Sequence, residues 1–262
     1  DGADELYAGY RRYVPFARYD FFQSNGFIRT GASLLNKLLP AAHDKKSTFN
    51  FITRLTGLAS KKDLEVYLSA GLDIIEGFEN NIHATEDYLL PLRTDFRRIN
   101  QSQLSGLKKI MNMDFDTNLF SDLLVKMDIA TMAHSLEGRS PFLGKELLEW
   151  VPGLPDAYKI KGGQTKVLLR ELAKNYLPEP LINQPKRGFE VPLKNWVNSE
   201  LNPMIRDYLT ASDTLYREFM DTAFVQQLLA NKINISAEKR AKIIWTIFCM
   251  EVWYRNLYRN QA

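Results

Sequence analysis

The 262-residue chain has 45% hydrophobic and 25% charged residues, as a soluble globular protein does. Its formal charge of +3 is small and its basic residues are scattered, so we predict no nucleic-acid-binding stripe. The single cysteine, Cys249, rules out an internal disulfide, and no apolar run reaches the ~20 residues of a membrane span. We therefore expect a cytoplasmic protein with one mainly α-helical domain over residues 1–262.

Aromatic residues recur three positions apart near the start of the chain, at Tyr7, Tyr10, Tyr13, Phe16 and Tyr19. This spacing predicts one face of a helix. A stripe facing the core is the simpler interpretation, and a platform for a ligand is the alternative. Residues 61–90 show a second helical pattern, which Pro91 is expected to end.

A further helix is predicted to begin at Ser121 as N-cap and to end near Gly138. Residues 150–163 and 183–196 are predicted loops, and Thr165 is the expected cap of the helix between them, which Pro178 and Pro180 close. The last helix, about residues 237–259, is apolar nearly all round and is expected to be buried. No segment has a convincing alternating pattern of a β-strand.

The opening turn concentrates acidic residues. Asp1, Asp4 and Glu5 fall within five positions, and Gly2 and Gly9 bracket most of the run. Glycine allows a tight turn and a close approach to a ligand. Carboxylates are the hard oxygen ligands that Mg²⁺ uses together with phosphate oxygens, so this turn is a candidate Mg²⁺–phosphate site. A solvated acidic turn that caps a helix is the alternative.

Lys166 follows Gly162 and Gly163 and is predicted to lie in the first turn of a helix. The helix dipole disfavours a cation there, whereas the free N–H groups of the same helix end attract anions. A lysine in that place suggests a phosphate between the two. An exposed lysine at a frayed helix end is the alternative, and the string lacks the spacing of a P-loop.

Lys126 and Asp128 are two positions apart on an otherwise apolar helix, so they do not share a face and cannot pair with each other. Lys126 needs a carboxylate and Asp128 an amine, and an α-amino acid offers both. Two side chains at the edge of the apolar face are the alternative. The three histidines lack metal-ligand spacing, and Cys249 is expected to be a packed thiol.

Taken together, several strings resemble the synthetase domain of glutamine-hydrolysing asparagine synthetases, in the family's order and at about its spacing over roughly residues 1–200. The strings are Asp1-Gly2-Ala3-Asp4-Glu5-Leu6 with Gly9-Tyr10, Lys126-Met127-Asp128, Met132-Ala133-His134-Ser135-Leu136-Glu137, Arg139-Ser140-Pro141-Phe142-Leu143, Gly163-Gln164-Thr165-Lys166 and Pro185-Lys186-Arg187-Gly188-Phe189-Glu190-Val191-Pro192.

The resemblance implies the helical C-terminal portion of an α/β PP-loop synthetase domain, of the adenine nucleotide α-hydrolase-like type. It implies a ligase that uses ATP and Mg²⁺ to adenylate the side-chain carboxylate of aspartate and then transfers ammonia from a glutaminase domain. A homodimer is possible in such a family. Asp1 matches the acidic residue thought to deprotonate ammonia, and Asp4 matches a carboxylate that holds Mg²⁺–pyrophosphate, with Glu5 beside it as a further cofactor-binding residue.

Lys166 matches the lysine that steadies phosphate charge during adenylation. Lys126 and Asp128 match positions that line the aspartate pocket, and Arg139 matches an anchor near it. The family's pyrophosphate loop and glutaminase domain are absent from this sequence, so we expect a longer parent protein and no activity from this chain alone.

Three positions depart from the family pattern: Ile129 stands where many members have arginine, Gly138 where valine is common, and Gly144 where aspartate is usual. A relative that acts on another carboxylate, and a non-catalytic helical scaffold, therefore remain as alternatives.

Overall fold

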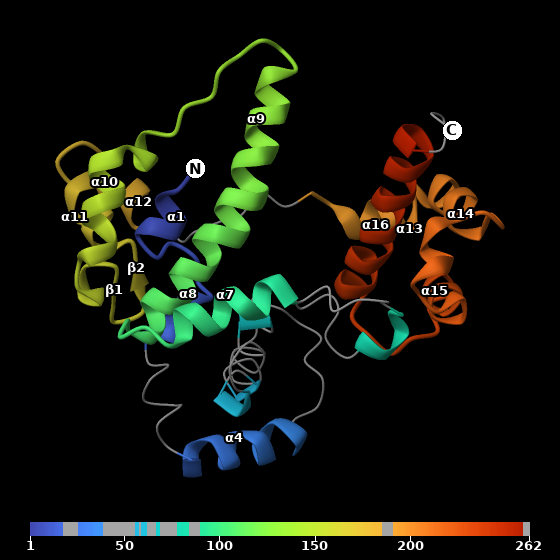
Figure 1. The fold of residues 1–262 in the computed structure, drawn as a ribbon, viewed down its shortest axis with the longest axis horizontal. Helices are drawn as coiled ribbons and strands as arrows, with labels where there is room; N and C mark the ends of the chain where they lie inside the picture. The colour runs from blue at the N-terminus through green and yellow to red at the C-terminus, as the bar shows by residue number, and fades with distance from the viewer. Residues whose placement is uncertain are drawn as a thin grey trace. The chain divides into compact units, whose positions relative to one another are not determined.

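The computed structural model describes residues 1–17, 26–38, 56–57, 59–61, 67–68, 78–83, 90–184 and 191–258. The chain divides into two compact units: the first comprises Asp1–Pro40, Phe51–Tyr67 and Leu90–Gly188, and the second Ala41–Asn50, Leu68–Leu89 and Phe189–Ala262. The described elements are mostly helices, which confirms the prediction of a mainly α protein (Figure 1). That residues 1–262 form a single domain stays a prediction.

A long helical run forms the centre of the first unit (Figure 1). Ser105 caps it through a hydrogen bond from Lys108 N to Ser105 Oγ, and α8 (Gly106–Asp114), a π-helical segment (Phe115–Leu123) and α9 (Leu124–Met132) follow without a break. The predicted helix start at Ser121 is wrong, since Ser121 lies inside this run and its Oγ donates to Asp116 O. The π-helical turns of Phe115–Leu123 depart from the 3.6-residue period on which a helix prediction depends.

The aromatic stripe near the start of the chain is not one helix face. α1 (Ala3–Leu6) ends before it, a turn follows, and α2 (Tyr13–Phe16) is a separate single turn of helix. Tyr7, Tyr13 and Phe16 are nevertheless buried, so the core interpretation of these three is confirmed. Tyr19 lies outside the described residues.

A β-hairpin lies within the predicted loop region. β1 (Ile160–Lys161) pairs antiparallel with β2 (Gln164–Thr165), and Gly162 and Gly163 form its two-residue turn, with φ of 60° and 83°. Two positive φ values in succession are what such a turn needs, which glycine supplies without strain. The expectation that Thr165 caps the next helix is wrong: Thr165 ends β2, and Lys166 is the N-cap of α11 (Val167–Ala173).

The first unit also contains α4 (Gly26–Leu38), α7 (Leu90–Asn100), α10 (Lys145–Trp150) and α12 (Glu179–Ile182), with 3₁₀ turns at Pro141–Leu143, Val151–Gly153 and Asp156–Tyr158. Pro91 and Pro180 lie in the first turns of α7 and α12, where a missing N–H is tolerated, so neither ends a helix as predicted. Most of the helix predicted over residues 61–90 lies outside the described residues. The predicted stop near Gly138 is also late, because α9 ends at Met132.

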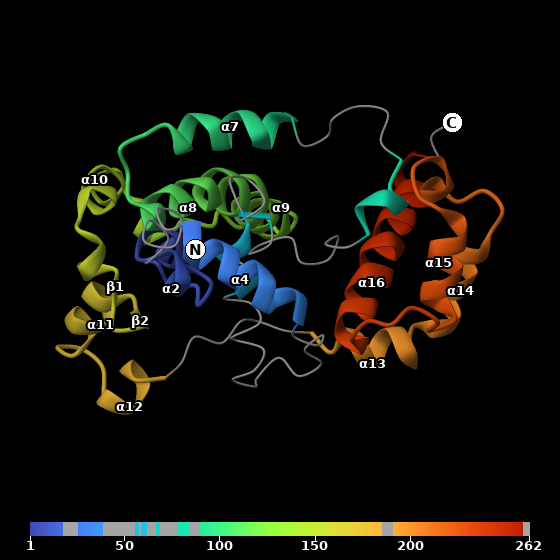
Figure 2. The same ribbon diagram turned by 90° about the horizontal axis from the view of Figure 1, so that it is seen from below.

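The second unit is a small helical bundle with its own core. It contains α13 (Leu193–Asn198), α14 (Asn202–Thr210), α15 (Thr222–Leu229) and α16 (Ala237–Trp253), with 3₁₀ turns at Glu79–Asn81 and Leu215–Glu218 and π-helical residues Tyr254–Tyr258 (Figure 2). Ile243, Ile244, Ile247 and Phe248 of α16 are buried, as predicted. Burial is not complete round the helix, since Trp253 is 48% exposed.

The expectation that Cys249 is a packed thiol is wrong, because this residue of α16 is exposed. Partial burial still raises the pKa of the thiol, which disfavours the nucleophilic thiolate.

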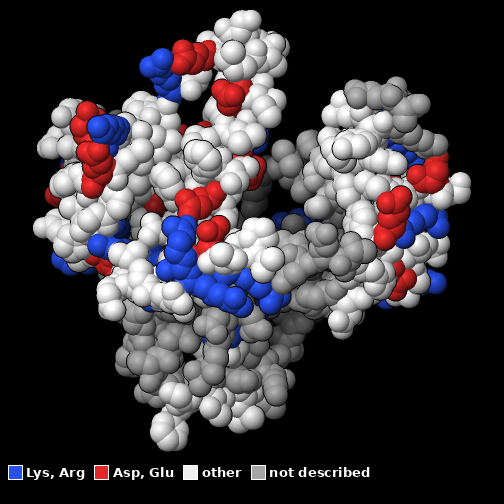
Figure 3. Space-filling view, in the orientation of Figure 1, with Lys and Arg blue, Asp and Glu red and all other residues white. Residues whose placement is uncertain are grey.

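None of the helices in the described ranges is long and apolar enough to cross a membrane. Charges of both signs are interspersed over much of the face in Figure 3, and basic side chains gather over α7, whose last turn carries Arg97 and Arg98.

Candidate functional site

An ion pair joins the opening turn to the β-hairpin. Lys166 Nζ lies 2.9 Å from Asp4 Oδ1, and the two side chains are 23% and 17% exposed. The pair is thus largely withdrawn from water yet reachable, which strengthens its electrostatic interaction. The sequence placed these residues in two separate candidate sites, and the structure brings them together in one.

Lys166 has an unusual backbone conformation. Its φ of 55° and ψ of 38° are left-handed, in a residue with a Cβ. Such a conformation costs about 1–2 kcal/mol and persists where surrounding structure imposes it. Here the hairpin β1–β2 feeds directly into α11, and Val167 N donates to Lys159 O across that junction. Lys166 was predicted to lie in the first turn of a helix, but it is the N-cap, one position before that turn. Because α11 has only seven residues, the argument from the helix dipole is weaker for Lys166.

Gly9 explains how the backbone can pass beside the pair. A Cβ built on Gly9 would collide with Asp4 Oδ1 and with Lys166 Cε. Gly9 N also donates to Asp4 O over 2.7 Å, which folds the turn back on itself. The missing side chain at Gly9 is thus a condition for the Asp4–Lys166 contact.

The segment after α9 packs on the first two residues of the chain. Ser140 Oγ donates to the carbonyl oxygen of Asp1, and a Cβ on Gly2, whose φ is 88°, would collide with the side chain of Leu143. Phe142 meets the Tyr7 ring edge-on, with centroids 6.1 Å apart. These contacts hold Asp1 at an exposed edge of the turn.

A hydrophobic cluster packs against α1 and α11, next to the two residues of the ion pair. Its buried members are Leu6, Tyr7 and Val151, and the residues packed on it are Phe115, Phe142, Leu143, Leu147, Leu148, Leu154, Leu168 and Leu169. The cluster draws on α1, the 3₁₀ turn at Pro141–Leu143, α10 and α11. Because protein cores are close-packed, it fixes α1 relative to α11 and with them the two halves of the ion pair.

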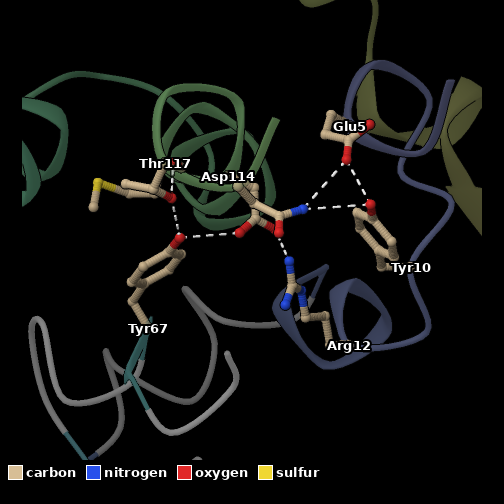
Figure 4. A network of polar contacts seen from close by, with 8 residues as sticks. Glu5, Tyr10, Arg12, Tyr67, Asp114 and Thr117 are labelled. Atoms are coloured by element: carbon tan, nitrogen blue, oxygen red, sulfur yellow. Dashed lines mark hydrogen bonds and ion pairs between the residues drawn. The ribbon is translucent and has the colours of Figure 1, made fainter. Parts of the chain in front are cut away.

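Glu5 is placed differently from its neighbour Asp4. It is 2% exposed, and its Oε1 accepts from the Tyr10 hydroxyl at 2.5 Å and from Asn118 Nδ2 at 3.4 Å (Figure 4). Burial and the hydrogen bond to Glu5 raise the pKa of Tyr10, so the phenol keeps its proton and donates. The structure does not bring Glu5 to the Asp4–Lys166 pair, and a cofactor-binding role for it stays a prediction.

A second polar network ties the turn after α1 to the long helix. Arg12 Nη2 lies 2.8 Å from Asp114 Oδ2, and the Tyr67 hydroxyl donates to Asp114 Oδ1 at 3.0 Å (Figure 4). The Tyr67 hydroxyl also lies 2.5 Å from Thr117 Oγ1. Asp114 is buried, so these contacts compensate the cost of its desolvation. The network is a structural support, and no sequence pattern predicted it.

Three predicted substrate residues lie apart from the pair. Lys126 and Asp128 are exposed on α9. Arg139 is 84% exposed on its side chain, and its guanidinium pairs with Glu137 Oε1 at 2.9 Å. Among the described residues, the structure shows no hydrogen bond or ion pair from these three to Asp1, Asp4 or Lys166. Their roles at an aspartate pocket stay predictions.

The position of Asp4 is compatible with Mg²⁺ that binds together with a phosphate. Within the described ranges no group of three or more His, Cys, Asp or Glu side chains could hold a metal ion. Mg²⁺ often binds through one or two carboxylates, with substrate phosphates and water completing its shell. A carboxylate beside a lysine is therefore compatible with Mg²⁺ that arrives with a phosphate.

The sequence analysis did not predict two features of this site, the role of Gly9 and the β-hairpin. Gly9 was noted only as a glycine near an acidic run, and its role depends on a contact with Lys166 that spacing cannot show. The hairpin had a signal, because two adjacent glycines are typical of a two-residue β-turn.

Comparisons with known proteins show which family this chain resembles. The family model described as Asparagine synthase matches residues 1–255. Asparagine synthetase [glutamine-hydrolyzing] 1 of Bacillus subtilis is 36% identical over 153 residues, 58% of this chain and 24% of that protein. A protein of Mycobacterium bovis named as a candidate glutamine-hydrolysing asparagine synthetase is 27% identical over 257 residues, 97% of this chain and 38% of that protein.

Amidase chry2 of Gibberella zeae is 27% identical over 113 residues, 41% of this chain and 17% of that protein. The chain thus spans well under half the length of these curated relatives. No solved structure matches it significantly.

Proposed function

The chain belongs to the asparagine synthase family, and from this premise we propose that it is part of an ATP-dependent ligase that converts a carboxylate to an amide. The proposed substrate is aspartate, activated as β-aspartyl-AMP and then attacked by ammonia from a glutaminase domain. The proposed architecture is the helical C-terminal portion of a PP-loop synthetase domain. The observation that carries the proposal is the Asp4–Lys166 pair, held at 2.9 Å in a partly open site.

The pair suits chemistry on phosphates. A cation fixed beside a forming or leaving phosphate neutralises charge that develops in the transition state, without reorganisation at that moment. Lys166 has this role in the proposal. Asp4 would hold the Mg²⁺ that accompanies pyrophosphate, and the ion pair keeps both side chains oriented until the nucleotide arrives. ATP with Mg²⁺ supplies the leaving group that makes the carboxylate reactive.

Asp1 would accept a proton from the attacking ammonia. Its exposed position at the edge of the turn leaves the carboxylate free to reach substrate, and Ser140 fixes its backbone. Lys126 and Asp128 would bind the α-carboxylate and α-amine of aspartate, and Arg139 would support them. The family's phosphate loop lies outside this sequence, so we propose that the 262-residue chain alone does not turn over.

Aspartate-dependent release of pyrophosphate from ATP by the full-length gene product tests the proposal. Lys166→Ala should lower this rate by about 10²–10³, the usual cost of removing one preorganised group that stabilises transition-state charge. Lys161→Ala is the matched control, since Lys161 is exposed on the same hairpin.

Release that needs aspartate and collapses only in Lys166→Ala would support the proposal. No release with aspartate, in a folded protein that binds ATP, would direct the assignment to another carboxylate. Failure to bind ATP as well would favour a non-catalytic scaffold.

A further inference from the structure

A cavity of about 300 Å³ lies beside α1, within the first unit. Its lining residues come from α1, the long helical run, α10 and the turns before β1. They are Glu5, Leu6, Leu104, Lys108, Met111, Asn112, Phe115, Leu148, Pro152 and Lys159. The volume is at the small end of the range for ligand pockets, about 300–1,000 Å³. Most of the wall is apolar, as in pockets that bind small molecules.

Lys159 is the unusual residue in this wall. It is only 1% exposed, and its Nζ donates to Pro152 O at 3.2 Å. An ammonium group has three donors, and in the described part of the chain the structure gives this one a single acceptor. Burial, with a further contribution from Lys108, lowers the pKa of Lys159 to about 8, against an opposing influence from Asp156. A buried lysine in the wall of a largely apolar cavity is costly unless an anion meets it.

The other charges at the cavity do not supply that anion. Lys108 is a second cation, and its Nζ donates to Gly153 O at 3.4 Å. Glu5 is the acidic residue of the lining, and its Oε1 already accepts from Tyr10 and Asn118. The lining itself thus holds two cations and one carboxylate, while Asp156, which opposes the lowering of the Lys159 pKa, lies outside the lining. One negative charge on an occupant would balance the charges of the lining.

We propose that this cavity is a binding site for a small monocarboxylate with an apolar body. The carboxylate would pair with the Lys159 ammonium, and the apolar part would lie against Leu6, Met111 and Phe115. Charge complementarity favours one carboxylate over a phosphate, which would bring more negative charge than the cavity lacks and would meet Glu5. The apolar majority of the wall favours a hydrocarbon body over an amino acid, because Glu5, the carboxylate of the lining, already accepts from Tyr10 and Asn118.

Two parts of the cavity wall are connected directly to the Asp4–Lys166 ion pair. Glu5 and Leu6 follow Asp4 directly on α1. Lys159 O accepts from Val167 N, so Lys159 is bonded to the residue after Lys166. A ligand that moves either wall would therefore change the Asp4–Lys166 contact. Binding itself is independent of the proposed function, whereas this coupling rests on it.

The test uses phenylacetate as the probe and its neutral isostere phenylacetamide as the comparison. Calorimetry measures the binding of each compound to the full-length gene product, without ATP or aspartate. Phenylacetate should bind at least about tenfold more tightly than the amide, as expected for a charge-assisted contact. Lys159→Met should abolish that preference while keeping an apolar stem in place. Lys161→Met, which changes an exposed lysine of β1 two positions from Lys159, should leave it unchanged. Met111→Trp should block both compounds by filling the cavity.

Equal affinities for acid and amide would overturn the proposal, as would a preference that survives in Lys159→Met. Undiminished binding to Met111→Trp would place the site elsewhere, and no binding by either compound to the folded wild type would also refute it. Because no nucleotide is present, the result is separate from the outcome of the pyrophosphate assay.

Discussion

Lys166 Nζ lies 2.9 Å from Asp4 Oδ1, although the two residues are far apart in the sequence. Two supports hold them there: a hydrophobic cluster beneath α1 and α11, and a glycine at position 9 that leaves room for both side chains. The pair is about four-fifths buried, so its two charges interact in a medium of lower dielectric than water. The following predictions depend on this arrangement and on the structures around it.

Gly9→Ala should impair the site more than the fold. The new Cβ would collide with Asp4 Oδ1 and Lys166 Cε, which belong to side chains that can move aside. We therefore expect a loss of pyrophosphate release of at least about tenfold with a cost in stability below about 1 kcal/mol. Steady-state rates and urea unfolding of the same preparation measure both.

Gly31→Ala is the matched control for that change. Gly31 is exposed within α4, and a Cβ there meets nothing within 4 Å. It should stabilise by up to about 1 kcal/mol through helix propensity and leave the rate unchanged. Equal activity in the two variants would show that Gly9 does not control the Asp4–Lys166 contact.

Asp114→Ala should destabilise the first unit by about 3 kcal/mol, since it leaves the Arg12 guanidinium without its buried carboxylate and the Tyr67 hydroxyl without an acceptor. The free energy of unfolding in urea measures this. Asp95→Ala breaks an exposed pair with Arg98, whose side chain is 67% exposed, and should cost less than about 1 kcal/mol. Similar costs for the two variants would argue against a buried network at Asp114.

Affinity for phenylacetate should depend on pH through Lys159. The pKa of this lysine is lowered to about 8, so the ammonium is present below that pH and is lost above it. Binding should be constant at lower pH and fall by about tenfold per pH unit above about 8. The other charged groups around the cavity are Lys108, Asp156 and Glu5. Lys159→Met should bind weakly with no such slope, and a slope that persists in this variant would assign the titration to another group.

Lys159 should also make stability depend on pH. Its pKa is lower in the folded chain than the ordinary 10.5, so the unfolded chain binds more protons between about 8 and 10.5. The free energy of unfolding should therefore rise with pH across this window, as far as Lys159 contributes. The difference between wild type and Lys159→Met, measured by urea unfolding at pH 7.5 and 10, isolates that contribution. A difference that does not change with pH would contradict a lowered pKa.

The sequence alone determined the mainly helical character of the protein, the burial of the aromatic residues Tyr7, Tyr13 and Phe16, and the apolar core of α16. Periodicity and composition suffice there, because a helix face that is apolar must be covered. The sequence also identified Asp4 and Lys166 as candidate site residues, each from its local pattern and from the family resemblance.

Only the tertiary structure decided that Asp4 and Lys166 form one site, that Glu5 turns inward from Asp4, and that Lys159 faces a cavity. Local patterns also misplaced the start of the long helix, since π-helical turns break the period on which such predictions rest. The physical reason is common to these cases. Spacing along the chain reports neighbours within one element, whereas ion pairs and cavities are made where different elements pack together.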